Sequence, residues 1–371
     1  MKHPPLSILY YKLSILFVFL LLSVPTQIHA QEINLHFPHF AGHQYDWKIF
    51  QGEKEFAVIS GEIPKDGRVT LVMPEVHKDY RGMTRWMLKK GGGLDMIYVG
   101  KGFSVECLSE QPTPETIIYT NNPENDYLAT QHRRQQTILD RLGAVNHLMQ
   151  VYPPDEDLHK MVSKEQGHLK QQFEQAQSDR AKSPLYAARF GEIVDFTRGV
   201  ADKVYETPGD HIIYFNNFVT HTLNFEDLYT SGHWDQVLHR WLMMNIRSKD
   251  SDHEVKNRLN AALNRMNQDD ILSAFIQKAV PLLVKEGKDD LLPGIVSHLD
   301  KHPDARAKLP DNVKNMISSF KILTGKRAPD LVLKAPVRTQ TSRSAKDITI
   351  ETGRLNSDYT ILLFYQGECQ L

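Results

Sequence analysis

The chain closes on the stretch Tyr359-Thr-Ile-Leu-Leu-Phe-Tyr365-Gln-Gly-Glu-Cys369-Gln-Leu371. An apolar run rich in β-branched and aromatic residues leads into a short polar loop that carries a cysteine. Such a run is typical of a strand buried on both faces of a sheet. The stretch therefore predicts a central strand that ends at Tyr365 and presents Cys369 from the loop beyond it.

The residues before this strand predict two more strands. Gly325-x-x-Ala328-Pro-Asp330 opens the region, and Ala328–Leu333 reads as a strand. A polar loop follows, then the alternating segment Asp347–Glu351, and then a turn at Asn356–Asp358. We therefore expect residues 321–371 to begin a small α/β domain without completing it.

This arrangement resembles the TlpA/ResA-like and peroxiredoxin-like (AhpC/TSA-related) branch of the thioredoxin superfamily. There, an Ala-Pro-Asp-type segment opens the domain, and a central strand ending in an aromatic residue leads to the active-site cysteine. The resemblance covers Gly325 to Leu371 and implies that Cys369 is the nucleophile of a thiol–disulfide oxidoreductase. It implies partners that carry protein thiols or disulfides, and no cofactor.

The family chemistry needs more than one thiol. The attacking thiol reacts as a thiolate, which a helix N-terminus stabilises, and a second cysteine in Cys-x-x-Cys then releases the substrate. Here the chain stops where the second cysteine would follow Leu371. We expect a chain truncated within the motif, in which Cys369 forms a mixed disulfide that the chain does not resolve, so that catalysis is lost.

The first 30 residues predict an export signal. Lys2 and Lys12 supply positive charge, the apolar run Leu13–Val24 has the length of a signal core, and Ala30 precedes a plausible cleavage site. The run is too short to span a bilayer, although an uncleaved anchor is the alternative interpretation. We expect a periplasmic or cell-envelope protein with no membrane span in its mature chain.

Composition indicates the class of protein and the kinds of partner. The 371 residues are 41% hydrophobic and 24% charged, which is ordinary for globular domains. Without Lys2 and Lys12, the 44 basic residues fall to 42 against 45 acidic ones, so nothing favours nucleic acid as a partner. Cys107 and Cys369 are the two cysteines. Cys107 reads as a small buried hydrophobe, although a bridge to Cys369 remains open.

Residues 31–110 predict a β-sandwich or open barrel. Short alternating segments are separated by turn residues, which is typical of antiparallel strands. Gly91-Gly-Gly93 reads as a hairpin turn rather than a phosphate loop. Residues 111–125 are rich in Pro and Asn and predict a linker.

Residues 126–320 predict an all-α domain of eight to ten helices, because apolar residues recur at helical spacing between Pro and Gly breaks. Paired helices of similar length would allow a solenoid-like stack. An aromatic cluster reads as packed core, with a ligand groove as the alternative; its members are Tyr214, Phe215, Phe218, Phe225, Tyr229, Trp234 and Trp241. Three histidine pairs lack metal-ligand spacing; they are His159 and His168, His211 and His221, and His233 and His239.

The sequence thus predicts a multi-domain α+β protein: an N-terminal β-sandwich, a central helical domain and an incomplete thioredoxin-like domain. The predicted function is thiol–disulfide exchange in the cell envelope through Cys369. The alternative is a non-catalytic periplasmic binding or scaffold protein built on the β and helical domains. The sequence leaves the oligomeric state, the substrate and the redox direction open.

Overall fold

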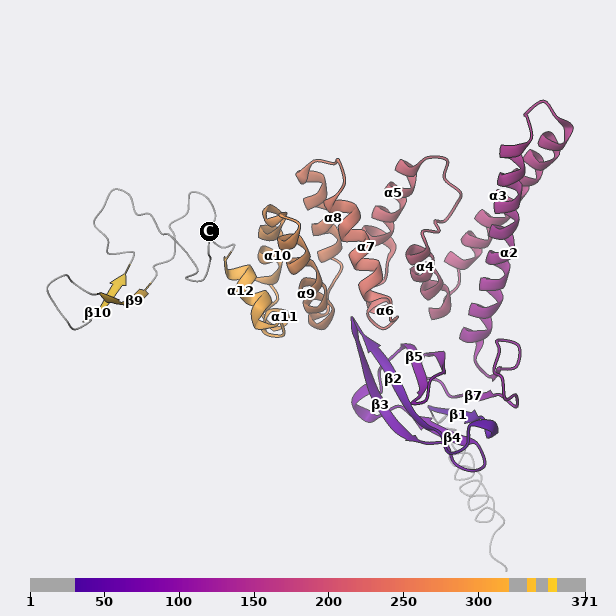
Figure 1. Ribbon diagram of the computed structural model, residues 1–371, viewed down its shortest axis with the longest axis horizontal. Coiled ribbons are helices and arrows are strands. Elements are labelled where there is room, and N and C mark those ends of the chain that lie inside the picture. Colours follow the sequence, from indigo (N-terminus) through magenta and orange to yellow (C-terminus); the bar gives the residue numbers. More distant parts are fainter. Residues whose placement is uncertain (1–30, 320–331, 338–345, 352–371) are drawn as a thin grey trace, which may run out of the picture.

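The computed structural model describes residues 31–319, 332–337 and 346–351 (Figure 1). The predicted leader at 1–30, the Ala-Pro-Asp segment, the strand Tyr359–Tyr365 and Cys369 lie outside these residues. The described chain has mixed α+β content: strands in two sheets come first, and a long helical region follows.

The N-terminal strands form two four-stranded sheets. The first sheet, in spatial order, consists of β4 (Arg68–Val72), β1 (Glu32–His36), β7 (Phe103–Glu106) and β8 (Ile118–Thr120). The second consists of β3 (Lys54–Glu62), β2 (Gln44–Gln51), β5 (Gly82–Leu88) and β6 (Gly93–Tyr98). Alternate residues of both sheets meet in one apolar core, as the period-2 pattern predicts.

Two features of the sheets differ from the prediction. β1 and β7 pair in parallel, with Ile33 opposite Phe103, although we expected antiparallel strands throughout. The second sheet is inserted between these two strands in sequence, and local alternation carries no information on such a non-local pairing. The Gly91-Gly-Gly93 hairpin is confirmed, because Met87 pairs with Gly93 and the Leu88 N–H donates to the Gly92 carbonyl (3.0 Å).

The predicted linker at 111–125 contains regular structure. It contains the strand β8, which pairs with β7, and α2 already begins at Pro123. Two of the residues that suggest a linker, Asn122 and Pro123, start the helix instead. Asn122 is the N-cap and accepts from the Asn125 N–H (3.1 Å), and Pro123 occupies the first helical turn.

The helical region contains eleven α-helices within residues 123–319, more than the eight to ten predicted. Two of them, α6 and α11, are five residues long, too short to show a helical period. The helices are α2 (Pro123–Val151), α3 (Asp157–Ala181), α4 (Tyr186–Arg198), α5 (Pro208–Asn217), α6 (Phe225–Tyr229), α7 (Trp234–Ile246), α8 (Asp252–Leu263), α9 (Asp269–Lys285), α10 (Leu292–Leu299), α11 (Pro303–Ala307) and α12 (Asp311–Ser319).

The helices form two parts. α2 and α3 make a long hairpin that projects beside a row running from α4 to α12, and the sandwich lies beneath the start of this row (Figure 1). α9 contacts α7, α11 and α12, and its buried apolar side chains belong to the main core of the helical region. None of the helices in the described residues is long and apolar enough to cross a membrane.

Beyond the helices, β9 (Val332–Val337) and β10 (Lys346–Glu351) pair antiparallel, with Leu333 opposite Ile350. β10 coincides with the predicted strand Asp347–Glu351. β9 runs to Val337, four residues past the predicted end at Leu333.

A candidate binding cleft between the sandwich and the helices

The thiol on which the sequence prediction depends, Cys369, lies outside the described residues. The other thiol, Cys107, directly follows β7 and is fully buried in the sandwich core. Its Sγ lies 3.7 Å from the Ser109 carbonyl oxygen and 3.8 Å from the Thr116 hydroxyl. The prediction that Cys107 is a small buried side chain is confirmed.

The aromatic cluster is largely core. Phe215, Phe218, Phe225, Trp234 and Trp241 are each at most 5% exposed and belong to the main helical core. Within the described structure, the half-buried Tyr229 borders the cleft described below, and the buried Phe225 borders the hollow beside it. The packed-core interpretation is therefore confirmed for the buried members.

The described residues contain no group of three or more His, Cys, Asp or Glu side chains placed to hold a metal ion. A histidine pair that the sequence analysis overlooked is His298 and His302, four residues apart, whose rings stack at 5.0 Å between centroids. The His302 Nδ1 lies 3.6 Å from an Asp269 carboxylate oxygen. The i,i+4 spacing would have revealed this pair.

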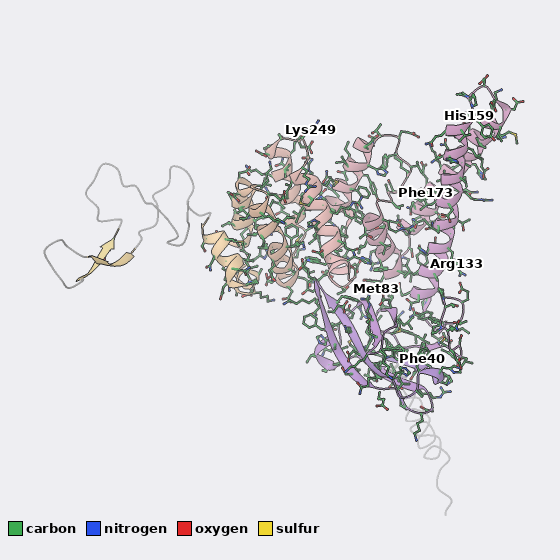
Figure 2. The ribbon with its side chains drawn as sticks, viewed as in Figure 1. Phe40, Met83, Arg133, His159, Phe173 and Lys249 are labelled. Carbon is green, nitrogen blue, oxygen red and sulfur yellow. The ribbon has the colours of Figure 1, made fainter. Side chains whose placement is uncertain are left out.

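The sandwich joins the helical region through backbone hydrogen bonds. The Gly52 N–H donates to the Tyr229 carbonyl (2.8 Å), and the Met83 N–H donates to the Thr230 carbonyl (3.0 Å). Figure 2 shows Met83 at this junction. Phe50, Met83 and Ile97 then pack on α4. The contact is as close as one between elements of a single domain.

The first turn of α2 closes one edge of the second sheet. Asn125 accepts from the Ile97 N–H (3.1 Å), and Asn122 donates to the Ile97 carbonyl (3.5 Å). Ile97 belongs to the edge strand β6, whose outward backbone groups would otherwise stay unpaired. These contacts fix the angle at which α2 leaves the sandwich.

A cleft of about 900 Å³ opens at the junction. One wall comes from the sandwich: Gln51, residues 75–81, Val99 and Lys101. The other wall comes from α2, α4, α6, α9 and adjacent residues: Glu124, Pro184, Tyr186, Arg189, Asn224, Glu226, Asp227, Tyr229, Thr230, Gln268, Asp270 and Ile271. Its volume lies within the range of small-molecule and cofactor sites.

Two buried tyrosines, Tyr80 and Tyr186, line the cleft. The buried Tyr80 hydroxyl accepts from the Phe50 N–H (3.1 Å) and donates to the Met83 carbonyl (2.5 Å). The Tyr186 hydroxyl lies 3.4 Å from the Asp227 carbonyl oxygen. Burial raises the pKa of both hydroxyls above the ordinary tyrosine value. Both hydroxyls therefore stay protonated and can donate to the Met83 and Asp227 carbonyl oxygens.

Charged groups tie the helices of the second wall together. The Arg189 Nε donates to an Asp227 carboxylate oxygen (2.5 Å), and this hydrogen bond is the main cause that raises the pKa of Arg189. The buried Glu124 accepts from the Ala187 N–H (2.7 Å) and the Tyr186 N–H (3.4 Å). A carboxylate from α2 thus caps the N-terminus of α4, where the helix dipole favours negative charge.

The two walls carry different charge. The sandwich wall has two acids, Glu75 and Asp79, against three bases, Lys78, Arg81 and Lys101. The helical wall has four acids against one base, Arg189. The cleft therefore presents a mildly basic side to an acidic side.

The lining of the cleft is suited to orienting a polar ligand. The Thr230 hydroxyl lies within 3.3–3.5 Å of the Glu226 and Asp227 carbonyl oxygens. Carboxamides, tyrosines and charges of both signs are groups that orient a polar ligand. Sequence reasoning missed this cleft because its walls come from segments far apart in the chain.

Comparison of the chain with protein-family models, with curated proteins and with solved structures finds no match.

Proposed function

We propose that the chain is a thioredoxin-like thiol–disulfide exchange protein of the cell envelope, with Cys369 as the attacking thiol. The observation that carries the proposal is the succession of strands before Cys369. Of the three strands expected there, β10 and the last part of the first fall within described residues, and they pair in one antiparallel ladder. After the predicted turn at Asn356–Asp358, the apolar stretch to Tyr365 and the loop bearing Cys369 follow in the sequence.

The burial of Cys107 supports the assignment of Cys369. A thiol reacts as its accessible thiolate, and Cys107 is 0% exposed. In the proposed step, the Cys369 thiolate attacks a partner disulfide. A new S–S bond joins Cys369 to the partner, the old S–S bond breaks, and the leaving sulfur takes up a proton. Because Cys107 is buried, an added thiol must release this mixed disulfide from the 371-residue chain.

Reaction with the aromatic disulfide 5,5′-dithiobis(2-nitrobenzoate) tests the proposal. We expect the native chain and Cys107→Ser to release one thionitrobenzoate per chain quickly and at equal rates. Cys369→Ser should react only as fast as the chain unfolds. A native chain whose fast phase survives Cys369→Ser would contradict the proposal.

The cleft favours a second candidate, a non-catalytic binding protein built on the sandwich and the helices. Its support is the lining of polar and charged groups on a preformed junction. Under this alternative, Cys369→Ser leaves the cellular function intact. Under the first candidate, the same substitution abolishes the mixed disulfide with a partner protein, so recovery of a disulfide-linked partner by the native chain and not by Cys369→Ser separates the two.

A further inference from the structure

We propose that the cleft and the hollow beside it form one groove that binds an extended polypeptide segment of a partner protein. The inference deepens the proposed function, on which it rests for the identity of the partner as a protein that carries thiols or disulfides. The binding itself involves no thiol, so the two proposals are tested separately.

The groove is longer than the cleft alone. A second hollow, of about 400 Å³, adjoins the cleft and shares five lining residues with it: Arg189, Asn224, Glu226, Gln268 and Ile271. The shared residues lie on or beside α4, α6 and α9. The cleft is by itself as large as a small-molecule site, so the continuation past α6 suits an elongated ligand.

Carboxamide side chains occur along this groove. Each offers a donor and an acceptor, which matches the alternating N–H and C=O groups of a peptide backbone. Gln51 and Asn267 make no side-chain hydrogen bond within the described chain. Gln268 donates to Glu226 (2.6 Å), and Asn224 accepts from the Glu226 and Asp227 N–H groups, which leaves one side of each amide available.

The charges favour a polypeptide over other polar chains. A neutral oligosaccharide would cover Lys101, Asp79 and Arg81 without neutralising them, which costs free energy. A small anion would use the basic side alone. A peptide can place an acidic side chain toward Lys101 and Arg81 and a basic one toward the acidic helical wall, so it matches both sides.

The walls are held before a ligand arrives. The backbone hydrogen bonds of Gly52 and Met83 to the residues around the end of α6 set the separation of the two walls. The ion pair Arg189–Asp227 holds the helical wall together. A preformed groove loses little conformational entropy on binding, so the entropy cost arises mainly from ordering the bound segment. We therefore expect the groove to bind an unfolded or flexible region of a partner.

Fluorescence anisotropy with fluorescein-labelled, reduced and carboxymethylated α-lactalbumin tests the inference. The probe is permanently unfolded and has no free thiol. The protein is the full chain with Cys369→Ser, which removes thiol exchange from the measurement. We expect saturable binding that Asn267→Trp weakens by obstruction and Lys101→Glu weakens by charge reversal, each about tenfold.

Matched controls lie outside the groove. Asn257 on α8 and Lys249 are exposed like Asn267 and Lys101, and Figure 2 places Lys249 on the side of the helical row away from the sandwich. Asn257→Trp and Lys249→Glu should leave binding unchanged. Circular dichroism confirms that each variant keeps its helical content.

The inference is overturned if the unfolded probe does not bind, if the control variants weaken binding as much as the groove variants, or if maltoheptaose displaces the probe. Absence of probe binding with a reactive Cys369 removes the groove and leaves thiol exchange standing. Probe binding with an unreactive Cys369 supports the groove and removes thiol exchange.

Discussion

Gly82 is required by the space around it. A Cβ at this position would lie 2.4 Å from the Thr230 Cβ, because the Gly82–Met83 backbone meets the residue after α6 directly. We predict that Gly82→Ala lowers the free energy of unfolding by about 1–3 kcal/mol, since neither backbone can move without breaking the Met83–Thr230 hydrogen bond. Urea denaturation measures the loss.

Gly143 in the middle of α2 provides the control. A Cβ there would meet nothing within 4 Å. Gly143→Ala should therefore stabilise the chain by about 0.5–1 kcal/mol through helix propensity. If Gly82→Ala is also neutral or stabilising, the junction is not as tight as described.

His298 makes stability depend on pH. Burial, and then the charges of His302 and Lys301, lower its pKa below the ordinary histidine value. The folded state therefore binds fewer protons than the unfolded state, and stability falls as the pH drops below about 6.5, the unfolded value. His298→Gln should reduce the loss of thermal stability between pH 7 and pH 5. If His298→Gln loses as much thermal stability as the native chain between pH 7 and pH 5, groups other than His298 cause the acid sensitivity.

At the residue scale, sequence reasoning succeeds where the cause is local. Cys107 alternates with Phe103 and Val105, and its burial follows from that pattern. The capping of α4 by Glu124 and the Arg189–Asp227 pair were not predictable in this way. Their partners are 63 and 38 residues apart, and only the packed fold brings them together.

At the element scale, a buried ion pair joins α3 to α4. The Arg180 Nη1 lies 2.6 Å from an Asp195 carboxylate oxygen, and Gln135 of α2 donates to the same oxygen (2.7 Å). Asp195→Ala leaves Arg180 charged and buried, so we predict a loss of about 3–5 kcal/mol in denaturant unfolding. Asp195→Leu combined with Arg180→Met should recover most of it, because no charge stays buried.

The ion pair between Asp157 and Lys160 at the start of α3 is a control of the same charge type. Its side chains are 97% and 62% exposed. Asp157→Ala should change the free energy of unfolding by less than about 1 kcal/mol. Equal losses for Asp157→Ala and Asp195→Ala would show that burial does not set the strength of these pairs.

Helices and strands are likewise predictable from the sequence where their cause is local and not where it is a distant contact. The long helix α2 and the β5–β6 hairpin are evident from periodicity and glycine placement. The three-residue strand β8 and the parallel pairing of β1 with β7 are not, because each exists only through a strand elsewhere in the sheet. The cleft belongs with the second group, as its walls are set by how the elements assemble.

At the scale of the whole molecule, the sandwich and the neighbouring helices are predicted to open together. The amides of Gly52 and Met83 donate across the junction, so they exchange with solvent only when it separates. In hydrogen exchange followed by mass spectrometry, the peptides that contain Gly52 and Met83 should be protected as strongly as those from the core of α9. Protection near that of the exposed α2–α3 tip would mean that the sandwich moves independently.

We propose that Cys369 exchanges disulfides with a polypeptide held in the groove. Mass spectrometry of the Cys107→Ser chain, mixed with unfolded α-lactalbumin that carries a disulfide to a small thiol, tests it directly. We expect a mixed disulfide at Cys369 whose yield falls in Asn267→Trp but not in Asn257→Trp. No adduct at Cys369, or one that forms equally in both variants, would contradict it.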